Sequence, residues 1–314
     1  MDEALLKQIS TGLRKAALNQ ETKAYILSNP ILFNTLKKAA DRYIGGDTLT
    51  ETIDKVKAQN KNGFKCSIEF MGESTRTEEH ANEARIEFLE VCRAIKSQGL
   101  NAAVSLDLSH IGLAISEDLC FNNLDLICRE AAMGDIEIIV SAEDSERTDA
   151  VLKTYFDISK IHQHVGITLQ AYLFRTKDDF ENVVKLNGRI RMVKGAFETP
   201  SGLSLSRGDV LDNLYLGYVK KLLSKNHLCS IATHDQNIQQ EVKKMIETYS
   251  AESNSYEFES LFGIQNQQLQ DLKDEGHPAK IYFVYGKEWY LYLCNRLAEY
   301  PLNVFQALND ILRA

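Results

Sequence analysis

Short β-prone runs alternate with longer helical segments from about residue 64 to the end of the chain. The runs are rich in β-branched and aromatic residues, whereas the segments between them space their apolar residues three or four apart. Parallel strands joined by helices form right-handed crossovers, and about eight such units over roughly 250 residues match a closed (β/α)8 barrel. The sequence therefore predicts an α/β fold of the TIM-barrel type. The predicted strands are 65–70, 102–107, 136–141, 166–171, 190–193, 228–233, 256–259 and 280–285.

An open, doubly wound parallel sheet is the second interpretation of the same alternation. Such sheets usually bind a dinucleotide at a glycine-rich turn after their first strand. No G-x-G-x-x-G sequence follows residues 65–70. The closed barrel is therefore the favoured interpretation.

The segment before the first strand has a helical pattern throughout. Thr48 and Glu51 have the spacing of a capping box, which predicts that the last helix of this segment begins near residue 48. We therefore predict a helical arm over residues 1–62 and a single barrel domain over residues 63–314.

The charge and hydropathy of the chain limit its partners. The formal net charge is −8 and the pI is about 5.5, which argues against a nucleic-acid partner because phosphate binding needs a basic stripe. The longest apolar stretches, such as 136–140, fall far short of the roughly 20 residues that a transmembrane helix needs. The N-terminus has no signal-peptide core. We expect a cytoplasmic protein without a transmembrane segment, and peripheral association with a membrane stays open.

The cysteines and histidines do not have the spacing of a metal site. No C-x-x-C pair and no H-E-x-x-H sequence occurs in the chain, so we expect no dedicated metal site and predict reduced cysteines in the core. The cysteines are Cys66, Cys92, Cys120, Cys128, Cys229 and Cys294.

Two cations lie three residues apart on a short run that otherwise reads as buried. Arg191 and Lys194 need anionic partners there, because an isolated buried charge is costly. One interpretation is a structural ion pair with Glu257 or Glu259. The other is a bound phosphate, which Gly195 favours because a residue without a side chain lets the backbone approach a ligand closely.

The last long helix carries polar residues on one face. Tyr292, Asn295, Arg296 and Glu299 repeat at spacings of three and four, so their side chains lie on the same side of the helix. Such a face is usually solvated, but Tyr282 on the preceding strand makes a pocket wall the alternative interpretation.

These segments together resemble the proline dehydrogenase family. The resemblance extends in order and spacing over some 250 residues, which makes it far more specific than any single motif. The segments that carry it are GITLQAYLFRT at 166–176, RMVKGAFETP at 191–200, ATHD at 232–235, YEFESLFGI at 256–264 and VYGKEWYLYLCNRLAEYP at 284–301.

The resemblance implies a distorted barrel that binds FAD and oxidises a carbon–nitrogen bond by hydride transfer to flavin N5. Electrons would then pass to a quinone or another acceptor. The flavin would supply the redox chemistry, and the protein would position the substrate and tune the ring. By matched position, Arg191 would lie near N5 and Gln170 against the isoalloxazine ring. The other implied cofactor-binding residues are Lys194 and Gly195 at the pyrophosphate, Ala196, Thr233 and His234.

The substrate side departs from the family pattern. The family holds the proline carboxylate with a Lys at the end of the second strand and an Arg-Arg pair on the last helix, and an Asp after the third strand pairs with the first Arg. Here the Lys position is Asp107, the Arg-Arg pair is Asn295-Arg296, and the Asp position is Ser141. The Tyr of the family's KGAY motif is Phe197. The matching positions are Tyr282, Tyr292 and Glu299, and the residues implied to be catalytic are Arg191, Tyr282 and Arg296.

An Arg and its Asp partner are lost together, which avoids leaving either charge buried and unpaired. Asp107 would repel a substrate carboxylate placed beside it. We therefore expect free proline to bind poorly. A proline-like amine or imino acid with a masked carboxylate, including a carrier-linked one, or one that offers a cation or a hydroxyl to Asp107, fits better.

Two other classes of function stay open from the sequence. A cofactor-free barrel lyase would use Lys194 as a Schiff-base nucleophile, which requires a desolvated lysine. A non-catalytic homologue that binds a ligand without turnover is the other class, and the altered pocket suggests it.

Overall fold

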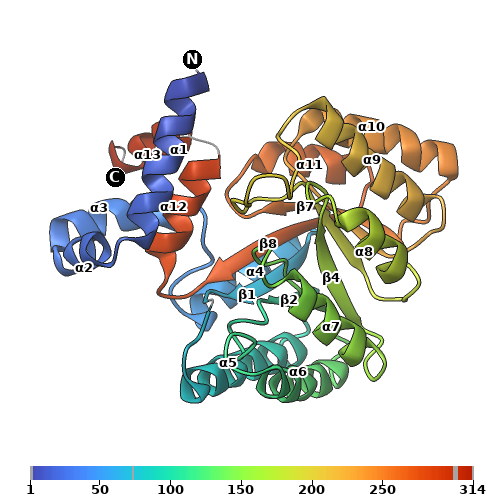
Figure 1. The fold of residues 1–314 in the computed structure, drawn as a ribbon, viewed down its shortest axis with the longest axis horizontal. Coiled ribbons are helices and arrows are strands. Elements are labelled where there is room, and N and C mark those ends of the chain that lie inside the picture. The colour runs from blue at the N-terminus through green and yellow to red at the C-terminus, as the bar shows by residue number, and fades with distance from the viewer. Residues whose placement is uncertain (1–2, 73, 300–302, 313–314) are drawn as a thin grey trace.

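The structure is a computed structural model that describes residues 3–72, 74–299 and 303–312. Parallel strands close into a barrel in which each strand pairs with the next and β8 pairs with β1 (Figure 1). The strands are β1 (Lys65–Phe70), β2 (Ala102–Leu106), β3 (Ile138–Val140), β4 (Val165–Gln170), β5 (Ile190–Val193), β6 (Cys229–Ala232), β7 (Tyr256–Leu261) and β8 (Ala279–Tyr285). The predicted barrel is confirmed, and the open doubly wound sheet is wrong.

Each predicted strand overlaps an observed one, and the differences lie at the ends. β3 is shorter than predicted, because it pairs with β2 only from Ile138 to Val140. β7 is longer, because Leu261 still pairs with Tyr282 of β8. The predicted order of elements is unchanged by these differences.

Helices cover the outside of the barrel. Their apolar faces pack on outward-facing strand residues such as Val104 and Phe258, which are fully buried in one continuous core. Thr48 and Glu51 form the predicted capping box at the start of α4. These helices are α4 (Leu49–Lys61), α5 (Glu78–Ser97), α6 (Glu117–Ala132), α7 (Thr148–Ser159), α8 (Thr176–Val183), α9 (Asp209–Leu223), α10 (Gln236–Tyr249) and α11 (Asn266–Asp274).

The remaining helices form a lobe beside the barrel, in which the N-terminal helices lie against the C-terminal ones (Figure 1). A second apolar cluster that includes Ala39, Trp289 and Leu293 joins them. The helices of the lobe are α1 (Glu3–Leu18), α2 (Gln20–Ser28), α3 (Pro30–Asp41), α12 (Trp289–Glu299) and α13 (Asn303–Leu312). The division of the chain near residue 62 stays a prediction.

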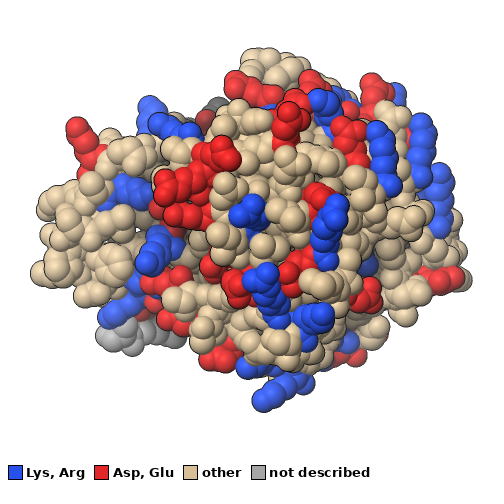
Figure 2. Space-filling view, turned by 90° about the horizontal axis from the view of Figure 1, so that it is seen from below, with Lys and Arg blue, Asp and Glu red and all other residues tan. Residues whose placement is uncertain are grey.

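The six cysteines are buried and form no disulfide, as predicted for core residues. Among the described residues, no helix is long and apolar enough to cross a membrane. Acidic and basic side chains are interspersed over the face of the molecule drawn in Figure 2.

Charged side chains fill the barrel interior near the amino-terminal ends of its strands. Lys280 is fully buried, and its Nζ lies 2.5 Å from Glu257 Oε1 and 2.8 Å from Glu259 Oε2. Arg189 Nε lies 2.7 Å from Glu137 Oε1. Because each of these charges faces an opposite one, the layer avoids the cost of isolated buried charges.

We predict that Lys280→Met destabilises the protein by about 3–5 kcal/mol, because it leaves two buried carboxylates without their shared cation. The free energy of unfolding in urea measures this. Lys221→Met is the control, since Lys221 pairs with Glu181 on the surface and such pairs contribute about 0–1 kcal/mol. Equal losses in the two variants would contradict the assignment.

Candidate functional site

The carboxyl ends of the strands meet at one mouth of the barrel, where sites of this fold are built. Successive strand residues point alternately into and out of the barrel. In β1 this places Lys65, Ser67 and Glu69 on one face, and in β8 it places Lys280 beside Lys65 and Tyr282 beside Ser67. The interior is therefore polar from its base to its mouth.

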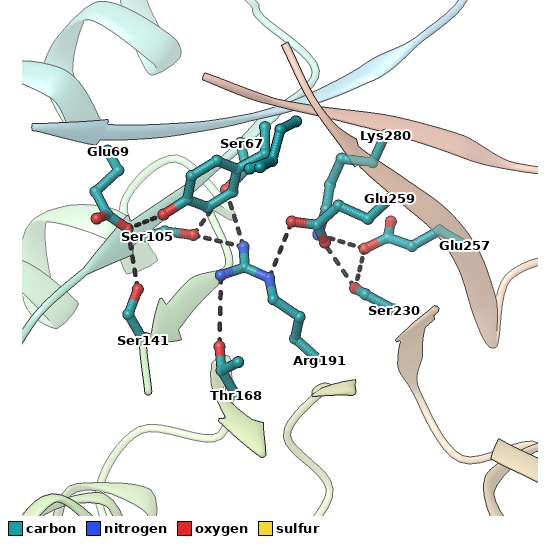
Figure 3. A network of polar contacts seen from close by, with 12 residues as sticks. Ser67, Glu69, Ser105, Ser141, Thr168, Arg191, Ser230, Glu257, Glu259 and Lys280 are labelled. Atoms are coloured by element: carbon teal, nitrogen blue, oxygen red, sulfur yellow. Dashed lines mark hydrogen bonds and ion pairs between the residues drawn. The ribbon is translucent and has the colours of Figure 1, made fainter. Parts of the chain in front are cut away.

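Arg191 lies at the centre of this interior, 4% exposed (Figure 3). Its Nε pairs with Glu259 Oε1 at 2.9 Å, and its Nη2 donates to Ser105 Oγ at 2.6 Å. Weaker bonds reach Ser67 and Thr168. The ion pair with Glu259 is one of the two interpretations that the sequence left open.

Tyr282 covers the guanidinium of Arg191. The centre of the ring lies 4.8 Å from Arg191 Cζ, which is a cation–π distance. Its hydroxyl donates to Glu69, and burial raises its pKa well above the usual range. The two residues implied to be catalytic on β5 and β8 are thus in direct contact.

Lys194 does not pair with Glu257 or Glu259, and that expectation was wrong. Its Nζ lies 2.6 Å from Asp212 Oδ1 and 2.8 Å from Asp235 Oδ2. The reason is its position just after β5, where the chain has left the barrel interior and faces the starts of α9 and α10.

The loop after β5 approaches its neighbours closely. Gly195 has φ +114°, and a Cβ there would lie 2.2 Å from the ring of Tyr172. Tyr172 also donates a hydrogen bond to the carbonyl of Phe197, and Phe197 itself is 39% exposed. A side chain at residue 195 would therefore displace the loop.

Two arginines that sequence reasoning missed hold the same loop. Arg207 Nη2 donates to the carbonyl of Gly195 at 2.6 Å. Arg14 of α1 pairs with Glu198 at 2.9 Å, and its Nη2 lies 3.5 Å from the carbonyl of Ala196. Neither residue lies at a strand end, so the rule that selected the other candidates could not find them.

Polar groups from β4 and β6 complete the mouth. Gln170 is buried and donates to the carbonyl of Glu143 at 3.0 Å. Thr233 Oγ1 accepts from the amide of Asp235, which caps α10. His234 Nε2 accepts from the amide of Leu261 at 3.1 Å.

The polar face of α12 is partly buried: Tyr292, Asn295 and Arg296 are half-buried, and Glu299 is exposed. Arg296 Nη2 lies 2.5 Å from Glu299 Oε1, and its guanidinium lies 5.1 Å from the centre of the Tyr292 ring. Arg296 Nε is buried without a hydrogen-bond partner among the described residues. Burial raises the pKa of Tyr292 to about 12. Asn295 lies between these residues on α12 and is partly exposed.

Glu69 connects several of the predicted substrate residues, and the sequence analysis missed it. Ser141 Oγ donates to Glu69 Oε2 at 2.9 Å, and the hydroxyl of Tyr282 donates to the same oxygen. The pKa of Tyr282 is raised further by the charges of Glu69 and Asp107, so Asp107 lies on the same side of the site. The alternation of Lys65, Ser67 and Glu69 on β1 was the signal that could have revealed it.

Comparisons with known proteins agree with this geometry. A family model described as Proline dehydrogenase matches residues 52–201 and 205–303. The chain belongs to the proline dehydrogenase family. Proline dehydrogenase 2 of Bacillus subtilis is 32% identical over 88% of this chain and 91% of its own length. The Deinococcus radiodurans proline dehydrogenase is 28% identical over 87% of this chain and 90% of its own.

A solved structure shares the fold. Proline utilization A of Bdellovibrio bacteriovorus superposes with a TM-score of 0.79 at 17% identity. The match covers 93% of this chain but only 36% of that protein, so the chain spans about a third of its length.

Members of the proline dehydrogenase family are FAD-dependent oxidoreductases that act on CH–NH groups, and this chain is one of them. The residues at the mouth fit such a cofactor. Lys194 favours a phosphate anion. Gly195 leaves room at the backbone, and His234 offers a neutral imidazole, because burial lowers its pKa to about 4. The individual cofactor and substrate contacts stay predictions.

We predict that Lys194→Ala folds but binds FAD at least tenfold more weakly, because it removes a cation and leaves Asp212 and Asp235 to repel the pyrophosphate. The ratio of flavin to protein absorbance after dialysis measures occupancy. Lys194→Ala/Asp212→Asn should recover part of the loss. Full occupancy in Lys194→Ala would place the phosphate elsewhere.

We also predict that stability falls as the pH drops from about 6.5 towards 4. Burial lowers the pKa of His110 to about 4, so the folded state resists a proton that the unfolded state accepts at its ordinary pKa of 6.5. His110→Phe should flatten the fall in melting temperature over this range relative to the parent. The exposed His80→Asn should leave the slope unchanged. An unchanged slope in His110→Phe would show that His110 is not buried as a neutral ring.

Proposed function

We propose that this enzyme oxidises the carbon–nitrogen bond of a proline-like cyclic amine whose carboxylate is masked or replaced. The observation that supports this most is the charge around the pocket. Asp107 occupies the position at which the family has a carboxylate-binding Lys, and Ser141 donates its hydroxyl to a buried glutamate. Arg296 is the one cation retained from the family clamp, and Glu299 already engages it at 2.5 Å.

This arrangement disfavours a free carboxylate. Two like charges about 4 Å apart repel by roughly 4 kcal/mol at the effective dielectric constant of a partly exposed site. A substrate amide or ester avoids that repulsion at Asp107. A neutral substituent also leaves the pair between Arg296 and Glu299 intact, so neither charge loses its partner.

The other residues have the following proposed roles. FAD supplies the hydride acceptor when it is bound, and a quinone or another acceptor reoxidises it. Lys194 and Gly195 would hold the pyrophosphate of the cofactor, and Ala196, Thr233 and His234 would contact other parts of it. Arg191, fixed by Glu259 and Ser105, would lie beside the reacting end of the flavin, as would Gln170.

The substrate walls are aromatic on two sides. Tyr282 lies over Arg191, and Tyr292 lies against Arg296, so both rings are oriented before substrate binds. Phe197 replaces the family's Tyr and is more exposed than either. Such preorganised apolar walls exclude water from the reacting carbon–nitrogen bond.

The environment of Lys194 does not support the lyase alternative. A Schiff-base lysine needs an apolar setting or a neighbouring cation to lose its proton. Asp212 and Asp235 instead flank its ammonium at 2.6 and 2.8 Å. Reduction of bound flavin by a substrate would also exclude a non-catalytic binder.

Anaerobic bleaching of the flavin by L-proline and by L-prolinamide tests the proposal. We expect kcat/KM for the amide to exceed that for the free acid at least tenfold, because only the acid brings a second negative charge to Asp107. Pyrrolidine, which has no substituent, is the matched control for ring recognition. Equal or better oxidation of L-proline would make the enzyme an ordinary proline dehydrogenase. Bleaching by none of the three would favour the non-catalytic homologue.

A further inference from the structure

We infer that Glu69 determines the charge of the substrate that this pocket selects. Its buried carboxylate, held by Ser141 and Tyr282, favours as substrate an alicyclic ammonium without a free carboxylate. It also requires residue 141 to be a neutral hydrogen-bond donor. This inference rests on the proposed function, since it names the substrate class of the same site.

Glu69 is held from both sides of the barrel. It lies near the carboxyl end of β1, with Ser141 just after β3 and Tyr282 on β8. Both hydroxyls donate to the same oxygen, Oε2. Figure 3 shows Glu69 beside Ser141 and apart from the group formed by Glu257, Glu259 and Lys280. The carboxylate is therefore fixed in direction and is 9% exposed.

The cations of the described barrel interior are engaged by other groups, and the charge of Arg191 opposes the rise in the pKa of Glu69 only in part. Arg191 directs its Nε to Glu259 and its Nη groups to hydroxyls. Lys280 is shared between Glu257 and Glu259. Among the residues that the structure describes, no Lys or Arg nitrogen forms an ion pair with Glu69. Burial accordingly raises the pKa of Glu69, and the ammonium of a bound amine would supply the charge that is lacking.

The same contact explains the residue at position 141. Ser141 Oγ lies 2.9 Å from Glu69 Oε2, so an Asp in its place would exchange a hydrogen-bond donor for a second carboxylate at about the same distance. Two carboxylates that close cannot both stay ionised without a large cost. The loss of the family's Asp is therefore coupled to Glu69 as well as to the loss of the Arg at Asn295.

Equilibrium binding to the FAD-loaded enzyme tests this without turnover. The probes are pyrrolidine, a cation, and cyclopentanecarboxylate, an anion built on the same size of ring, and perturbation of the flavin spectrum reports binding. We expect the parent to prefer pyrrolidine, and Glu69→Gln to shift the ratio of the two Kd values at least tenfold towards the carboxylate. Glu87→Gln is the matched control, because Glu87 accepts a hydrogen bond from Tyr285, also on β8, but lies on α5 outside the barrel.

A double-mutant cycle tests the coupling to Ser141. Ser141→Asp should lower the melting temperature more in the parent than in Glu69→Gln, whereas Ser141→Asn should cost about the same in both. An unchanged ratio of Kd values in Glu69→Gln, or equal tolerance of Ser141→Asp in both backgrounds, would overturn the inference. If Glu69→Gln does not fold, Ser141→Asp and Ser141→Asn are compared with each other. Relative to Ser141→Asn, Ser141→Asp must then weaken the binding of cyclopentanecarboxylate more than the binding of pyrrolidine, or the inference fails.

The two proposals fail in different ways. If L-proline is oxidised as well as its amide, the proposed function is wrong whatever Glu69→Gln does to binding. If the amide is preferred but the ratio of Kd values is unmoved by Glu69→Gln, the proposed function stands and the selecting charge lies elsewhere, at Asp107.

Discussion

Buried charge inside the barrel is the constraint on which the rest of the structure depends. Arg191 is held by Glu259, Ser105, Ser67 and Thr168, and these partners come from four different strands. A guanidinium taken out of water is costly unless its charge is paired and it has hydrogen-bond acceptors. Closure of the barrel and the pairing of Arg191 therefore occur together, since an open sheet would not bring β1 and β2 to β5 from across the interior.

The same network limits what the mouth can do. Glu259 is shared by Arg191 and Lys280, so the negative charge below the mouth is already neutralised. Charges nearer the mouth must be balanced by other groups, and Arg296 is itself engaged by Glu299. The sign of the net charge in the pocket thus depends on a few acidic side chains near the ends of β1 and β2. The large ion network beneath them does not set it.

Local patterns were sufficient to predict the fold but only part of the site. The strands were predictable because short runs rich in β-branched and aromatic residues alternate with helical segments, and the rule that sites follow strand ends selected Lys194, Gln170 and Thr233. Partners far apart in sequence were not predictable in the same way. A pairing of Lys194 with carboxylates of β7 was one of the two interpretations, yet Lys194 reaches Asp212 and Asp235, because a residue after a strand end no longer faces the barrel interior.

The helical lobe is the part of the site that sequence spacing could least predict. α1 packs along α12, and Arg14 of α1 reaches the loop after β5 through Glu198. The polar face of α12 carries the pair of Arg296 and Glu299, whose side chains are 16% and 25% exposed, and burial raises the pKa of Glu299 while Arg296 and Arg14 oppose that rise. A partly exposed pair contributes to stability only while its surroundings hold its geometry fixed. The N-terminal helices therefore support the substrate side of the barrel mouth, although they contribute no strand to it.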